Sequence, residues 1–172
     1  AGEAPAARNA YVGSPVERIE DLTLLRGKGQ FVDDLDRPGI LHAAVLRSSV
    51  PHGRIVRLDA SAALAMPGVH SVITAADLGE TMPVIPLRLI PMVELEPYGQ
   101  PVIAREKVRY VGEAIAVVLA DSLALGEDAL AAIELEIEAL PPVPDRKVAL
   151  ADTSLLFEDI GSNLVITYTA AK

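Results

Sequence analysis

The three histidines are the side chains of this sequence best suited to binding a metal or acting as a general base, and their spacing decides whether they act together. His42 falls in the middle of an apolar run, His52 in a turn, and His70 at the start of a second apolar run. No two of them have the spacing that places metal ligands on one helix or one hairpin. We therefore expect ordinary structural or surface histidines.

Two acidic groups could in principle hold a cation or perform paired acid–base chemistry: Asp33, Asp34 and Asp36, and Glu134, Glu136 and Glu138. The first group lacks the mid-loop Gly and terminal Glu of a twelve-residue calcium loop, and Pro38 falls inside its span, so we expect a turn with solvated carboxylates. The second group alternates with Leu and Ile, so a strand places all three carboxylates on one face, which we expect to be solvated.

Glycines and serines do not supply a site either. Arg26-Gly27-Lys28-Gly29 matches neither the phosphate-loop nor the dinucleotide spacing, and a strand is expected to follow it, so it predicts a chain reversal. Ser48-Ser49 lacks the context of a nucleophile elbow. We expect no catalytic, cofactor-binding or metal-binding residue in this chain.

Composition bounds the classes of protein that remain. The 172 residues suit one domain, and 51% are hydrophobic, with no Trp, two Phe and four Tyr, so the core must be built from Ala, Val, Leu and Ile. A net charge of −9 opposes nucleic-acid binding. The absence of cysteine excludes disulfides, iron–sulfur clusters and thiol catalysis on this chain.

Neither a membrane span nor a secretory signal is expected. No apolar run approaches the roughly 20 residues that cross a bilayer. Residues 1–10 lack a basic stretch followed by an apolar one. These features predict a cytoplasmic protein.

The periodicity of apolar residues predicts strands joined by short helices and turns. Strands are expected at 30–32, 40–46, 54–58, 69–73, 108–111, 114–120, 133–140 and 164–169. A helical turn is expected at 18–25, an Ala-rich helix after Asp59 or Ser61, a helix capped by Asp121 or Ser122, and one helical turn within 145–160. The run 40–46 is apolar almost throughout, which indicates burial on both faces.

Residues 79–101 form no regular element in this prediction. Four prolines interrupt a segment that is otherwise rich in apolar side chains, at positions 83, 86, 91 and 97. The fold class is α+β, with a flexible arm at 1–13, a single domain at 14–150 and a connecting segment at 151–172.

Three stretches resemble the large subunits of molybdenum hydroxylases, the xanthine dehydrogenase/aldehyde oxidase family. They are GQFVDD with PGILHAAVLRS at 29–34 and 38–48, PHGRI at 51–55, and QPVIA with VRYVGEAIAVV at 100–104 and 108–118. The sequence departs from the family pattern around the second stretch, where Ser49-Val50-Pro51 replaces a Pro-His-Ala-type turn and Gly53 replaces a common Ala. The resemblance covers residues 13–150, in order.

This resemblance implies an N-terminal α/β-hammerhead domain, ordered strand-strand-strand-helix-strand-strand-helix-strand. It implies a subunit that binds molybdopterin and hydroxylates an aldehyde or N-heterocycle, passing electrons through [2Fe–2S] clusters to FAD. The implied partners are the molybdenum-binding remainder, an iron–sulfur small subunit and an FAD medium subunit. The family's cofactor-binding and catalytic segments lie downstream of this domain, so no site residue carries over.

Two functions remain open at this point. The chain is either a non-catalytic structural piece of a molybdenum hydroxylase or a free-standing binding or assembly module that reuses the hammerhead fold. We expect the chain alone to be inactive. The residues at 79–99 are expected to dock against the molybdenum-binding remainder, the alternative being that they fold back over the domain's own sheet.

Overall fold

The structure, a computed structural model, describes residues 15, 17–35, 37–85 and 92–169. The chain divides into two compact units, Ala1–Ile40 and Leu41–Lys172. The arm expected at 1–13 lies outside the described residues.

The first unit contains the expected helical turn, as helix α1 (Asp21–Leu25). Arg18 Nε lies 2.8 Å from Asp21 Oδ1 at its start. The helix ends because Gly27 adopts a φ of +66°, which turns the chain so that the N–H of Lys28 donates to the Thr23 carbonyl at 3.0 Å. The glycine-rich run is therefore a chain reversal, as expected.

The strand expected at 30–32 is wrong. A short 3₁₀ helix, η1 (Val32–Asp34), forms instead. The Asp34 carboxylate accepts a hydrogen bond of 2.9 Å from the N–H of Phe31, and a side chain that satisfies the backbone locally favours a turn over a strand.

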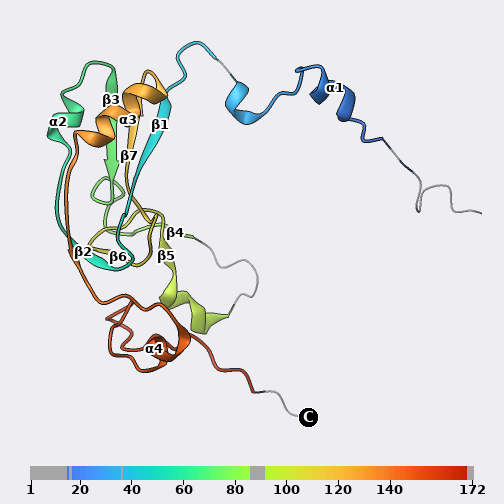
Figure 1. The fold of residues 1–172 in the computed structure, drawn as a ribbon. Coiled ribbons are helices and arrows are strands. Elements are labelled where there is room, and N and C mark those ends of the chain that lie inside the picture. The colour runs from blue at the N-terminus through green and yellow to red at the C-terminus, as the bar shows by residue number, and fades with distance from the viewer. Residues whose placement is uncertain (1–14, 16, 36, 86–91, 170–172) are drawn as a thin grey trace, which may run out of the picture. The chain divides into compact units, whose positions relative to one another are not determined.

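The second unit is built on an antiparallel sheet of strands β1 (His42–Arg47), β7 (Ala114–Ala120) and β3 (Val69–Thr74), in the order β1-β7-β3 (Figure 1). These are the strands expected at 40–46, 114–120 and 69–73. The central strand reads AIAVVLA and has no polar side chain.

Helices α2 (Ser61–Leu64) and α3 (Leu123–Ala131) cover one face of this sheet. Ser122 caps α3, since its side chain accepts the N–H of Leu125 at 3.2 Å, as the sequence predicted. Gly126 allows the close approach of helix and sheet, because a Cβ at this position would lie 2.9 Å from the Cβ of Ala44. The core between them is made of small aliphatic residues: Ala44, Ala63, Val72, Ala116, Val118, Ala120, Ala129 and Ile133.

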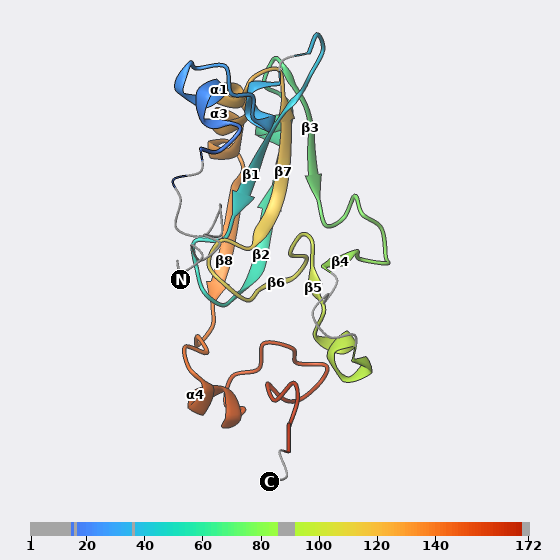
Figure 2. The same cartoon turned by 90° about the vertical axis from the view of Figure 1, so that its right-hand side faces the viewer.

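A second antiparallel sheet has the order β6-β2-β8, with β6 (Lys107–Val108), β2 (Gly53–Asp59) and β8 (Glu134–Ala139) (Figure 2). Strand β8 alternates as predicted, with its glutamates exposed and Leu135 and Ile137 packed on a second core of Ala104, Val108 and Ile115. The strand expected at 108–111 is shorter than predicted. The N–H of Arg109 donates to the carboxylate of Glu113 instead of extending the ladder.

The segment 79–101 contains more regular structure than expected. Strand β4 (Val84–Ile85) pairs antiparallel with β5 (Gln100–Pro101), and a 3₁₀ helix, η2 (Val93–Tyr98), lies between them in the sequence. Both strands have only two residues, consistent with the prolines that limit them.

The C-terminal part contains helix α4 (Arg146–Leu150), the helical turn expected within 145–160. Asp145 caps it by accepting the N–H groups of Lys147 and Val148 at 2.7 and 3.1 Å. The strand expected at 164–169 is wrong, because residues 164–169 join no ladder among the described strands. Over the described part of the chain, no helix is long and apolar enough to cross a bilayer.

Candidate functional site

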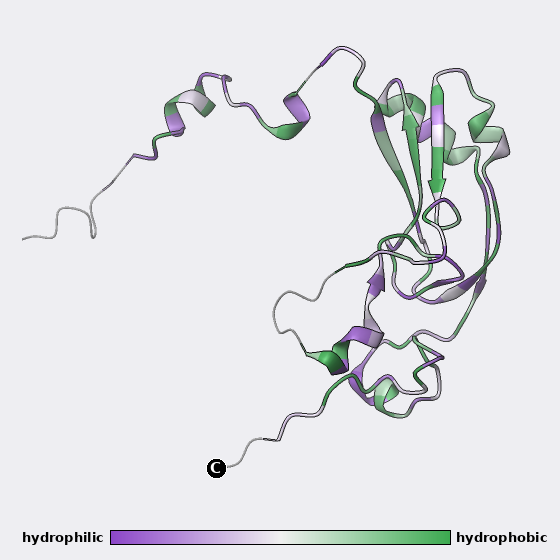
Figure 3. Ribbon diagram, turned by 180° about the vertical axis from the view of Figure 1, so that it is seen from behind, coloured by the Kyte–Doolittle hydropathy of each residue, from purple (hydrophilic) through white to green (hydrophobic). Residues whose placement is uncertain are grey.

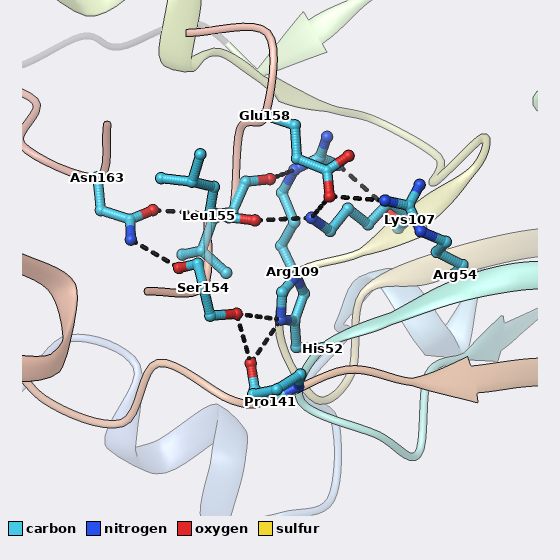
Figure 4. A network of polar contacts seen from close by, with 10 residues as sticks. His52, Arg54, Lys107, Arg109, Pro141, Ser154, Leu155, Glu158 and Asn163 are labelled. Atoms are coloured by element: carbon cyan, nitrogen blue, oxygen red, sulfur yellow. Dashed lines mark hydrogen bonds and ion pairs between the residues drawn. The ribbon is translucent and has the colours of Figure 1, made fainter. Parts of the chain in front are cut away.

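A junction of polar groups joins the second sheet to residues 141–163 (Figure 4). Its centre is Lys107 on β6, whose side chain is only 6% exposed. The ammonium donates to the Leu155 carbonyl at 2.7 Å and lies 3.3 Å from Glu158 Oε1. Glu158 also receives a 2.6 Å contact from Arg54 of β2. These two cations lower the pKa of the Glu158 carboxyl, with the hydrogen bond from Arg54 the larger cause.

The Arg109 side chain contacts a backbone carbonyl and an aromatic ring of the same C-terminal segment. Its Nε donates to the Leu156 carbonyl at 3.0 Å, and its guanidinium lies 4.6 Å from the ring centroid of Phe157. Phe157 in turn meets Tyr98 of η2 edge to face, with centroids 5.5 Å apart. The junction therefore fixes both the C-terminal segment and the end of the 79–101 segment.

His52 is the remaining side chain of the junction and contacts the backbone at Pro141. It is 2% exposed, and its Nδ1 lies 2.7 Å from the Pro141 carbonyl. Because a carbonyl only accepts, Nδ1 carries the proton, and Nε2 of the neutral ring has no partner among the described residues. Burial lowers the pKa of His52.

His52 and Ser154 have the composition of a base and a nucleophile but not the geometry. Ser154 Oγ lies 3.4 Å from His52 Nδ1, and both groups donate to the carbonyl of Pro141. The nitrogen that would accept the serine proton already bears one, so the pair is structural rather than catalytic.

Glu113 is a second buried group that sequence reasoning did not single out. It is 1% exposed; its Oε2 accepts the N–H of Arg109, and its Oε1 has no partner among the described residues. Burial raises the pKa of this carboxyl, and the Arg109 N–H opposes that rise. The available signal was a single acidic residue between Gly112 and a seven-residue apolar strand.

A cavity of about 360 Å³ lies beside the junction, lined in part by Arg54, Arg105, Lys107 and Arg109. Its cations already have partners, since Arg105 donates to the Ala75 and Gly79 carbonyls and the others are paired as described. Each of the four cations therefore already donates to at least one acceptor of the chain itself.

The remaining sequence candidates lie apart from the junction and from each other. His42 is exposed at the start of β1, and His70 Nε2 contacts Asp121 Oδ1 at 2.7 Å. Ser48 Oγ donates to the Val50 carbonyl, so it serves a turn. Within the described ranges, no group of three or more His, Asp or Glu side chains could hold a metal ion.

The fold and these motifs belong to a known domain. Residues 26–141 match the family described as "Aldehyde oxidase and xanthine dehydrogenase, a/b hammerhead domain". The chain belongs to this family, so the resemblance and the α+β hammerhead fold are confirmed.

Two relatives are, by name, the large chain or large subunit of an enzyme. The carbon monoxide dehydrogenase large chain of Hydrogenophaga pseudoflava is 42% identical over 142 residues, covering 82% of this chain and 17% of that protein. The nicotine 6-hydroxylase large subunit of Paenarthrobacter nicotinovorans is 39% identical over 146 residues, covering 85% of this chain and 18% of that protein. The reconstituted CO dehydrogenase from Oligotropha carboxidovorans matches with a TM-score of 0.70 and 40% identity, covering 86% of this chain and 18% of that one. The chain spans about one fifth of the length of these relatives.

Proposed function

We propose that this chain is the non-catalytic structural and assembly domain of a molybdenum hydroxylase large subunit. The observation that carries the proposal is the family match over 26–141, in a chain that spans about one fifth of its large-subunit relatives. The substrate of the assembled enzyme is an aldehyde or an N-heterocycle. The names of two relatives add carbon monoxide as a third candidate. The enzyme is proposed to work in the cytoplasm.

The proposed cofactors are molybdopterin, [2Fe–2S] clusters and FAD, and this chain's residues do not fit them. The sequence has no cysteine to ligate iron, and the described residues include no metal-binding group. The four cations that line the cavity already donate to acceptors of the chain itself, which argues against a dedicated phosphate site. The cofactors are therefore assigned to the molybdenum-binding remainder, the iron–sulfur small subunit and the FAD medium subunit.

The proposed boundaries are an arm at 1–13, the hammerhead domain at 14–150 and the start of the connection to the remainder at 151–172. The polar junction supports a role for the last segment. Glu158 accepts from Arg54 of β2, the Leu155 carbonyl accepts from Lys107 of β6, and Ser154 donates to the Pro141 carbonyl. These contacts would set the direction in which a continuing chain leaves the domain.

The segment 79–99 is proposed to dock against the remainder. Val84 and Ile85 on β4 are 53% and 46% exposed, and Val93 is 75% exposed, although all three are large and apolar. None of the described residues of 79–99 contributes to, or packs against, either hydrophobic core, which argues against a covering loop. Leu89 and Ile90, expected to take part, lie outside the described residues.

The test is co-purification with metal analysis. When a tagged chain is expressed in its own host and purified, a protein that contains molybdenum and iron is expected to co-purify with it. The variant Ile85→Ser/Val93→Ser is expected to lose that protein with an unchanged melting curve. The matched control Val56→Ser, at an exposed valine of β2, is expected to keep it. Recovery of the chain without molybdenum or iron would favour the free-standing module.

A further inference from the structure

One face of the sheet β1-β7-β3 is apolar and has no cover within the described part of Leu41–Lys172. The strand register places its side chains in two rows across the sheet: Val45–Val117–Ile73 and Ala43–Leu119–Ser71. Their neighbours Ala44, Val118 and Val72 point the other way, into the core beneath α3.

Helices α2 and α3 both pack on that other face. None of the six side chains contributes to, or packs against, either hydrophobic core. Val45, Ile73, Val117 and Leu119 are half-buried. Figure 3 shows the strands of this sheet largely in the colour of apolar residues.

The chain itself contains a strand with a solvent-exposed face for comparison. On β8, Glu134, Glu136 and Glu138 alternate with apolar residues. Strand β7 also alternates between two faces, but its alternate positions carry Val117 and Leu119, whereas those of β8 carry glutamates. An apolar sequence on both faces is typical of a strand covered on both sides. An apolar sheet face without a covering element usually marks a partner surface.

We propose that this face, defined by Ala43, Val45, Ser71, Ile73, Val117 and Leu119, docks against the molybdenum-binding remainder of the large subunit. The inference rests on the proposed function. The length of the relatives supports this occupant, because about four fifths of each large subunit lies outside the matched region. Short aliphatic side chains without a charge suit a flat, dry protein interface.

The experiment uses single cysteines, which report cleanly because the chain has none of its own. Val45→Cys and Ile73→Cys place a thiol on the proposed surface. Val118→Cys is the buried control, and Val56→Cys, at a valine 59% exposed, is the accessible control. Each full 172-residue variant is treated with a maleimide alone and after co-expression with the molybdenum-binding portion of its large subunit. Labelling is quantified by mass spectrometry of the modified peptide.

The expected result is that residues 45 and 73 are labelled in the chain alone and lose labelling in the complex. Unchanged labelling at both positions in a complex that does form would overturn the docking surface and leave the proposed function intact. Protection in the chain alone would overturn it too. Light scattering then shows whether a second copy or the chain's own residues cover the face. Failure of the two parts to associate would overturn both proposals.

Discussion

The ammonium of Lys107 and the carboxylate of Glu158 lie 3.3 Å apart, yet their side chains are 6% and 47% exposed. Loss of the pair would therefore leave a buried, uncompensated charge on Lys107, whereas Glu158 would remain solvated. Glu158 is half in solvent and shares its charge with Arg54.

Glu158→Gln is expected to destabilise the chain by about 1–2 kcal/mol. This is less than the loss of a partner in a fully buried pair, because Glu158 is solvent-screened and the Leu155 carbonyl still accepts from Lys107. Urea unfolding at neutral pH measures the loss. The matched control is Arg57→Gln, which breaks an exposed pair with Glu134 and should cost about 0.5 kcal/mol or less. Equal effects would mean that the burial of Lys107 is irrelevant.

Glu158 should also contribute to acid lability. Its pKa is depressed in the folded chain, so its stabilisation is present above the ordinary value of 4.5 and is lost as the pH falls through the folded pKa. The difference in unfolding free energy between parent and Glu158→Gln should therefore shrink towards zero in acid. A difference that stays constant with pH would contradict this.

Glu113→Gln is expected to show the opposite pH dependence. Burial raises the pKa of Glu113, so the stability it contributes is fully present below 4.5 and is lost as the pH rises through the folded value. Glutamine stays neutral and can still accept the Arg109 N–H. The variant should therefore gain stability relative to the parent as the pH rises above 4.5. A parent that becomes relatively more stable over this range would show that the carboxylate is well solvated.

Gly112→Val is expected to destabilise by about 1–3 kcal/mol through backbone strain rather than crowding. Gly112 adopts a φ of +89°, but no atom lies within 4 Å of the position that a Cβ would take. Gly112→Ala should therefore also lose stability, and Gly112→Asn should lose less, because Asn tolerates positive φ better. Thermal melting compares the three, and a parent-like melting temperature for Gly112→Val would refute the strain.

Gly126→Ala is expected to destabilise although alanine favours helix by up to about 1 kcal/mol. The added Cβ meets the Cβ of Ala44 at 2.9 Å, and crowding in a packed core costs about 1–3 kcal/mol. Ala44→Gly should relieve the contact, so the double variant should be more stable than the sum of the single effects predicts. Strict additivity in urea unfolding would show that the helix shifts freely.

The isolated chain is expected to bind no molybdenum, iron or flavin. The motivation is the lack of cysteine and of a metal-spaced histidine group in the sequence. Elemental analysis and the visible absorption spectrum of the purified chain provide the measurement. Stoichiometric metal or flavin would require a site that the described residues do not contain.

Strands β7 and β8 and the start of helix α3 could be predicted from sequence because their signals are local. Strand β8 alternates strictly, β7 is an uninterrupted apolar run, and Ser122 stands directly before the helix it caps. The errors arose where a distant or side-chain contact replaced a ladder. The Asp34 carboxylate accepts the N–H of Phe31, and η1 forms in place of the expected strand. The Glu113 carboxylate accepts the N–H of Arg109, which would otherwise have extended β6.

The polar junction could not be predicted in the same way. Arg54 and Glu158 are 104 residues apart in the sequence, and His52 and Ser154 are 102 apart. No sequence periodicity relates positions so far apart. Only the family resemblance predicted how the separate helices and strands are arranged together.

The pairing of the strands has a consequence for how this chain is made. Strand β1 must wait for β7, and β2 for β8, because more than 60 residues separate the two strands of each pair in the sequence. Contacts so distant in sequence form slowly. The first main sheet is complete only when Ala120 has left the ribosome, and the second only when Ala139 has. During that interval the apolar strands β1 and β3 have no partner, which is when aggregation threatens and a chaperone has most to protect.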